Sequence, residues 1–221
     1  MDAYLEIGAK RVFAGAIEWP GWCRSARDEA AAWQSLLDSA PRYARALRGT
    51  RLGFTAPGAP ELKILERLEG DATTDFGAPS IAPAADARPL TERDLDRQVR
   101  ILRACWRTFD RAAEAAQGVE LAKGPRGGGR DLAAIVGHVA GSDAAYGRMI
   151  GAGTPSVEGR AAAAALDDIR AALIETLRRA ASEGLPERGP RGGARWTARY
   201  FVRRAAWHAL DHAWEIVDRS M

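Results

Sequence analysis

Residues 207–214 read Trp-His-Ala-Leu-Asp-His-Ala-Trp, and they lie within a longer stretch, 200–219, in which apolar residues recur every three or four positions. This spacing predicts an amphipathic helix. His208 and His212 are four residues apart, so on a helix both imidazoles lie on one face, one turn apart. Two imidazoles in this arrangement can bind one metal ion.

The sequence contains only one further histidine, His138, which falls in a second expected helix, residues 131–150. If the two helices pack side by side, all three imidazoles can converge on one point. Three imidazoles without a fourth protein ligand describe an open metal site. Zinc sites of this kind keep water in the last position and are more often catalytic than structural.

The competing interpretation is that these histidines are packed core residues with ordinary hydrogen-bond partners. Four residues at 3-4-3 spacing form the core stripe of the helix, namely Trp207, Leu210, Trp214 and Val217. His208 and His212 therefore lie beside the stripe, with Arg204 and Glu215 near their face. Polar residues that border a core stripe need partners, which favours a metal in the centre of a bundle.

Four stretches of the C-terminal part have apolar residues at helical spacing, which predicts an up-down-up-down four-helix bundle over residues 90–221. The first helix follows a cap near Thr91. Its stripe consists of Leu95, Val99, Leu102, Trp106, Phe109 and Ala113. The second helix is residues 131–150, the third contains residues 166–177, and the fourth is residues 200–219.

The N-terminal part has a different pattern, which predicts a small ββαβ block over residues 1–70. Two short strands are expected between residues 4 and 22, a helix at 28–47 and a third strand at 62–68. Residues 71–89, rich in Gly, Pro and Ala, are expected to form a linker. The expected fold class is therefore α+β. The N-terminal block should be a separate unit that packs on the bundle or pairs with a second copy of itself.

The hairpin, the Pro20-Gly21 turn and the helix that follows resemble the HicB-like antitoxin module. The resemblance covers a short segment of common residue types. The alternative is that the block is a sheet that covers one side of the bundle.

Composition places the chain among globular proteins, with 47% hydrophobic residues over 221 positions. No run of 18 apolar residues appears, so neither a transmembrane span nor a signal peptide is indicated, and we expect a cytoplasmic protein. Cys23 and Cys105 are far apart and form no CxxC motif, which excludes a zinc finger or a disulfide framework.

The charge balance does not indicate a nucleic-acid partner. The isoelectric point is about 9.1, but the formal net charge is only +3 and the charges alternate along the expected helices. The expected partner is a small molecule, with anionic molecules among the candidates, and neither nucleic acid nor membrane is expected.

Two similar Gly-Pro-Arg-Gly-Gly loops precede the two histidine-containing helices, at residues 123–130 and 188–195. In an up-down-up-down bundle these helices run in the same direction, so both loops would lie at one end. Arg126, Arg191 and Arg195 could then bind the carboxylate of a substrate. The alternative is that both are ordinary loops in an arginine-rich protein.

A four-helix bundle with one histidine in its second helix and an HxxxH in its last resembles the DinB/YfiT-like superfamily, over residues 90–221. His138, within Val136–Asp143, falls where the family has its first ligand, and His208 and His212 fall on the other two. The resemblance implies one divalent metal, commonly zinc or nickel, and often a homodimer. It also implies metal-dependent hydrolases and thiol-dependent enzymes, including bacillithiol transferases and mycothiol-dependent isomerases.

The expected function is that of a metal-dependent enzyme that activates water or a low-molecular-weight thiol, because a divalent metal lowers the pKa of either. Glu215, Asp211 and Asp143 are the candidates for moving protons, followed by Tyr146 and Tyr200. The alternative is a non-catalytic metal-binding or regulatory protein with an antitoxin-like N-terminal module.

Overall fold

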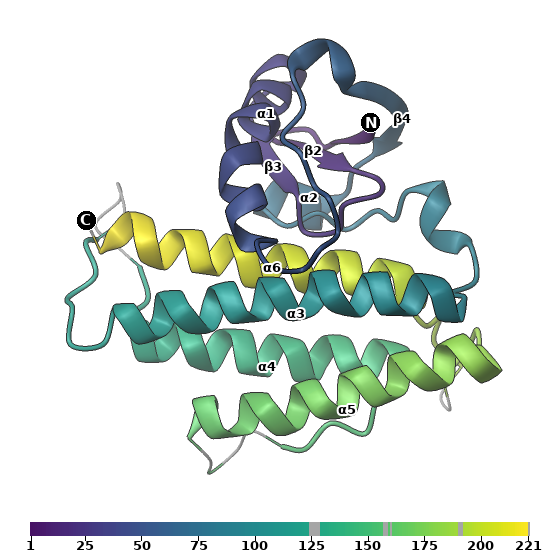
Figure 1. Cartoon of the computed structure of the whole chain (residues 1–221), viewed down its shortest axis with the longest axis vertical. Helices are drawn as coiled ribbons and strands as arrows, with labels where there is room; N and C mark the ends of the chain where they lie inside the picture. Colours follow the sequence, from purple (N-terminus) through teal and green to yellow (C-terminus); the bar gives the residue numbers. More distant parts are fainter. Residues whose placement is uncertain (124–128, 157–158, 160, 190–191, 221) are drawn as a thin grey trace.

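The computed structural model describes residues 1–123, 129–156, 159, 161–189 and 192–220. It contains a small sheet with one long helix at the N-terminus and a four-helix bundle at the C-terminus, and the sheet part sits on one side of the bundle (Figure 1). The expected α+β class is confirmed.

The sheet has four strands in the order β3-β2-β1-β4. The strands are β1 (Asp2–Ile7), β2 (Val12–Ala16), β3 (Cys23–Ala26) and β4 (Lys63–Glu69). β1 pairs with β2 and β2 with β3 in antiparallel fashion, whereas β1 and β4 are parallel. The ββαβ prediction lacked β3, because its four residues, Cys-Arg-Ser-Ala, show no apolar alternation.

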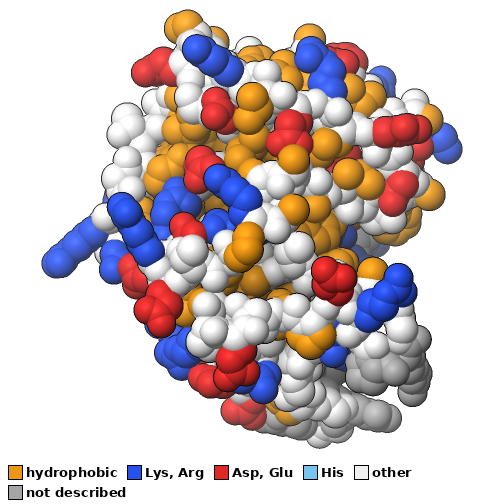
Figure 2. Space-filling view, turned by 90° about the vertical axis from the view of Figure 1, so that its right-hand side faces the viewer, with side chains coloured by type: hydrophobic (Ala, Val, Ile, Leu, Met, Phe, Trp, Pro, Cys, Tyr) orange, Lys and Arg blue, Asp and Glu red, His pale blue; other side chains and the backbone are white. Residues whose placement is uncertain are grey.

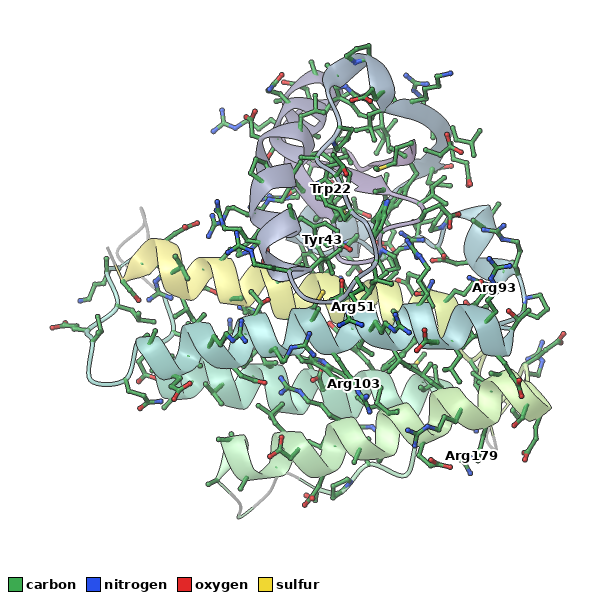
Figure 3. All side chains as sticks on the ribbon, viewed as in Figure 1. Trp22, Tyr43, Arg51, Arg93, Arg103 and Arg179 are labelled. Carbon is green, nitrogen blue, oxygen red and sulfur yellow. The ribbon has the colours of Figure 1, made fainter. Side chains whose placement is uncertain are left out.

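Helix α1 (Glu29–Ala46) connects β3 to the segment that leads into β4, and it runs on through Pro41. It packs on the sheet through a cluster of aromatic rings. Trp22 and Tyr43 are fully buried with stacked rings 5.9 Å apart, and both are labelled in Figure 3. The indole of Trp22 donates to Leu36 and Ser39 of α1, which fixes the helix against the sheet.

The bundle consists of α3 (Glu92–Ala115), α4 (Leu132–Ile150), α5 (Ala162–Glu183) and α6 (Ala198–Arg219). Side-chain caps begin three of the four helices. The side chain of Thr91 accepts a hydrogen bond from the amide of Asp94, as predicted. The side chain of Asp131 caps α4 and that of Thr197 caps α6 in the same way, each by accepting from an amide of the first turn.

The helix directions differ from the predicted up-down-up-down order. The start of α3 lies beside the start of α6, where Arg199 contacts Asp94, so these helices are parallel. The end of α4 lies beside the start of α6, because Trp196 donates to the carbonyl of Met149. α4 is therefore antiparallel to α6 and parallel to α5, and the connection from 151 to 161 returns along the bundle (Figure 1).

The segment between the sheet and the bundle, expected as a linker, is ordered and joins the two parts. It contains α2 (Ala72–Phe76) and a short 3-10 helix (Ala84–Ala87). The buried carboxylate of Glu6 in β1 accepts hydrogen bonds from Thr74, Ser80 and Ile81. This segment is therefore held against the sheet along its length.

The sheet part packs on α3 and α6 through one continuous buried cluster. Gly21 lies at this contact with φ of +91°, and a Cβ there would lie 3.1 Å from the Cβ of Ala206 and 3.3 Å from the sulfur of Cys105. Only glycine allows this turn to approach the bundle so closely. The division into residues 1–70, 71–89 and 90–221 stays a prediction, but the shared core indicates that the parts stabilise each other.

Charged side chains are mixed on the face that Figure 2 shows, where Lys and Arg lie among Asp and Glu. Neither sign of charge dominates this face.

Candidate metal centre

The histidines of α4 and α6 come together between the two helices. His138 lies seven residues into α4, and His208 and His212 lie on the facing side of α6. The ring centroids are 5.0 Å apart for His138 and His208, 4.9 Å for His138 and His212, and 4.6 Å for His208 and His212. One nitrogen from each ring lies within 4.8 Å of the other two.

The arrangement of these nitrogens fits a divalent metal. Nε2 of His208 lies 3.1 Å from Nε2 of His138. Two imidazole nitrogens bound to one tetrahedral zinc ion at the usual bond length lie about 3.3 Å apart. These two nitrogens therefore already have nearly the spacing of a pair of ligands.

The protonation state of the rings also fits. The pKa of His208 lies well below its usual range, first because burial penalises the imidazolium and then because His212 and His138 are close. Burial is also the main cause of the lowered pKa of His138. Both rings are neutral at pH 7, so a metal ion does not have to displace a proton from either.

Glu215 orients the third ring from the side away from the centre. Its Oε2 lies 2.7 Å from Nδ1 of His212, which therefore carries the proton and leaves Nε2 free to bind a metal. Its Oε1 accepts a hydrogen bond of 2.6 Å from Arg219. Arg219 in turn donates to the carbonyls of Ala122 and Arg130, so the same side chains fix the connection between α3 and α4.

We predict that Glu215→Ala lowers the metal affinity by about 10- to 100-fold, as the loss of an outer partner of a ligating histidine usually does. A chelating dye in competition with the protein measures this affinity. Asp211→Ala is the matched control, because it removes a carboxylate from the same helix and should leave the affinity unchanged. Equal effects of both substitutions would contradict the role of Glu215.

The other two predicted acids do not lie with the histidines. Asp211 pairs with Arg24 of β3 at 3.0 Å, on the side of α6 that faces the sheet. Asp143 is fully buried on the side of α4 that faces α5, where Nε of Arg170 is 3.8 Å away. Of the three, only Glu215 contacts the centre.

Burial raises the pKa of Asp143 from 3.8 to about 7, although the nearby charge of Arg170 opposes this. Between these two values the folded state holds a proton that the unfolded state has lost, so this carboxyl makes the protein less stable as the pH rises. We predict that Asp143→Asn raises the free energy of unfolding at pH 8 by on the order of 2–4 kcal/mol, with much less effect at pH 4. Denaturant unfolding at both pH values measures this. A pH-independent effect would contradict it.

The two glycine-rich loops do not share one end of the bundle, as the predicted arginine rim required, because their described residues lie at opposite ends. Arg130 lies beside the end of α6, whereas Arg195 lies beside Gly151, near the start of α6. The prediction relied on parallel α4 and α6, and these helices are antiparallel. Arg126 and Arg191 lie outside the described residues.

The two predicted tyrosines differ in their relation to the centre. The ring of Tyr146 lies edge-on to His208, with centroids 5.6 Å apart. Tyr200 instead directs its hydroxyl to the carbonyl of Ser80, 2.7 Å away, and so joins α6 to the segment before the bundle.

Of the three rings, that of His138 on α4 is the most exposed. His138 is partly exposed, and a Cβ added at Gly137 or Gly141 would have no heavy atom of its surroundings within 4 Å. These two glycines therefore leave the surface of α4 beside His138 free of side chains.

The cysteines do not contribute to the centre. Cys23 and Cys105 are free and buried, and burial raises the pKa of both thiols, that of Cys23 to about 12. Neither sulfur is a thiolate at neutral pH.

Comparisons with known proteins cover the bundle. The family model described as the DinB superfamily matches residues 101–216, which is more than half of the 221 residues. No curated protein and no solved structure gives a significant match. Within the described ranges, no helix has the length and apolar character needed to cross a membrane. The matched residues include all three histidines of the centre, and the chain belongs to the DinB superfamily.

Proposed function

We propose that this chain is a metal-dependent enzyme in which His138, His208 and His212 hold one divalent ion, zinc or nickel. The observation that carries the proposal is the geometry of the centre, in which the nitrogens lie within 4.8 Å of one another and a side of His138 is open. Three neutral nitrogen ligands suit these two metals.

A divalent ion held by neutral imidazoles supplies a Lewis acid that lowers the pKa of a bound water or thiol. The surrounding residues prepare the site for such chemistry. Glu215 holds His212 in one tautomer, and its own pKa is lowered by His212 and then by Arg219, so it stays a carboxylate. Burial raises the pKa of Tyr146, so its phenol stays protonated beside His208.

The proposed reaction class is hydrolysis or the transfer or isomerisation of a small molecule with the help of a low-molecular-weight thiol. Both need a nucleophile at neutral pH and an open position at the metal. We also propose, from the family resemblance, that the protein acts on a small molecule and forms a homodimer.

Cobalt-substituted protein tests this proposal, because its visible spectrum reports what occupies the metal. We expect a small thiol such as 2-mercaptoethanol to add a sulfur-to-cobalt charge-transfer band, since an open position accepts an outside ligand. A spectrum that the thiol leaves unchanged would mean a closed site. It would favour a non-catalytic metal-binding role.

A further inference from the structure

Arg204 lies beside the three histidines, one helical turn before His208 on α6, and only 8% of its surface is exposed. Its guanidinium lies over two aromatic rings, 5.5 Å from the centroid of Tyr146 and 4.8 Å from that of Trp207. Tyr146 is the same ring that lies edge-on to His208. The positive charge of Arg204 therefore adjoins the side of the centre that Tyr146 borders.

This buried charge forms no ion pair in the described part of the chain. Nη1 of Arg204 is buried without a hydrogen-bond acceptor, and no carboxylate of a described residue forms an ion pair with the guanidinium. Its neighbour Arg203, by contrast, is paired with a carboxylate, because two nitrogens of its guanidinium donate hydrogen bonds to Asp86. An unpaired buried charge is costly, so a folded protein rarely keeps one without a use.

The buried carboxylate of Glu6 interacts with the charge of Arg204 through space, but the two groups form no ion pair or hydrogen bond. The two carboxylate oxygens of Glu6 instead accept hydrogen bonds from the hydroxyl of Thr74 and the amides of Ser80 and Ile81. The two rings compensate part of the cost of burying Arg204, because a cation over an aromatic face is attracted to it, but they leave the N–H donor of Nη1 unsatisfied. A bound ligand with an acceptor at this position would satisfy it.

We propose that Arg204 binds the carboxylate of a small organic acid whose other end reaches the three histidines. This inference rests on the proposed function, and it names the substrate class and the residue that recognises it. A planar guanidinium between two rings matches a planar carboxylate, and its single charge balances a monoanion. A phosphate dianion would call for a second cation, and no other arginine joins Arg204 at the two rings among the described residues.

The spacing limits the size of this acid. Arg204 and His208 are four residues apart, roughly 6 Å along the helix axis. Three bonds between the carboxylate carbon and the group directed at the histidines span about 4 Å, and the contacts at the two ends cover the remainder. Short thiol acids such as 3-mercaptopropionate have these dimensions.

Ligand binding to zinc-loaded protein tests the inference by calorimetry, with 3-mercaptopropionate and the neutral 2-mercaptoethanol as probes. We expect the wild type to prefer the acid by at least tenfold. Arg204→Gln should lose this preference while it keeps the metal content and the affinity for 2-mercaptoethanol. Arg204→Lys keeps the positive charge but not the planar guanidinium, and it should retain part of the preference. A retained preference in this variant would show that the loss in Arg204→Gln does not come from misfolding. Arg103→Gln removes an exposed arginine of α3, labelled in Figure 3, and should change nothing.

A second readout separates this inference from the metal. Trp207 lies against Arg204, so its fluorescence should change when propionate binds to metal-free wild type and not to metal-free Arg204→Gln. If the protein binds no metal but propionate still depends on Arg204, the proposed function fails and the carboxylate site stands. If both proteins bind the acids equally, with or without metal, the carboxylate site is wrong.

Discussion

The His208→Ala variant should purify without the stoichiometric divalent metal of the wild type. Nε2 of His208 lies 3.1 Å from that of His138, and its ring centroid lies 4.6 Å from that of His212, so the ring contacts both other members of the ligand set. Removing it leaves two imidazoles, and the loss of metal affinity should exceed the roughly 10- to 100-fold expected for an outer partner. Elemental analysis after dialysis measures the content.

Circular dichroism of the same variant should show an intact helical bundle, because the core stripe of α6 does not depend on this ring. Equal metal content in the variant and the wild type would show that the ion is bound elsewhere. A variant that loses both metal and helix would instead indicate a structural ion.

The second large effect concerns the contact between the sheet part and the bundle. Arg203 of α6 is buried and donates to Asp86 through Nε at 2.6 Å and Nη2 at 2.8 Å. It also donates to the carbonyls of Ala16 and Ile17 at 2.7 and 2.8 Å. One side chain thus joins the bundle, the sheet and the segment between them.

We predict that Arg203→Ala lowers the free energy of unfolding by about 3–5 kcal/mol, because Asp86 is left as an unpaired buried charge. Denaturant unfolding measures the loss. Arg100→Ala breaks an exposed pair with Asp96 and should cost less than about 1 kcal/mol. Adding Asp86→Leu to a hydrophobic replacement, Arg203→Met, should recover much of the stability, because no charge then remains buried. A loss below 1 kcal/mol in Arg203→Ala would show that the two parts are not coupled through this residue.

The position of the histidines could be predicted because it depends on local spacing. His208 and His212 are one turn apart on any helix, and only the packing of a second helix was needed to bring in His138. The same geometry explains why one of the predicted acids, Asp143, does not lie with the histidines. Asp143 is five residues from His138, which turns it about 140° around the helix, and it lies towards α5 instead.

The helix directions could not be predicted, because they depend on the path of a loop. The connection from 151 to 161 has eleven residues, which can span about 36 Å when extended. α4 has 19 residues and is about 28 Å long. The chain can therefore turn back directly or return along the whole bundle, and nothing in the composition of the loop decides between them. The prediction that both glycine-rich loops lie at one end of the bundle failed for this reason.

The role of residues 71–89 could not be predicted either, because it depends on contacts between residues that are distant in sequence. Their Gly, Pro and Ala content is typical of a linker, but Asp86 meets Arg203 across 117 positions of sequence. Local patterns do not report such long-range pairs. The carboxylate expected near the histidines, Glu215, was found because it is only three residues from His212.

X-ray absorption at the metal edge of the metal-loaded protein tests the central claim most directly. The account predicts three imidazole nitrogens at about 2.0–2.1 Å from the metal, with at least one further light ligand from solvent. The scattering pattern of the imidazole rings should weaken in His138→Ala and His212→Ala as well as in His208→Ala. A metal surrounded by sulfur, or by oxygen ligands without the three imidazoles, would contradict the account.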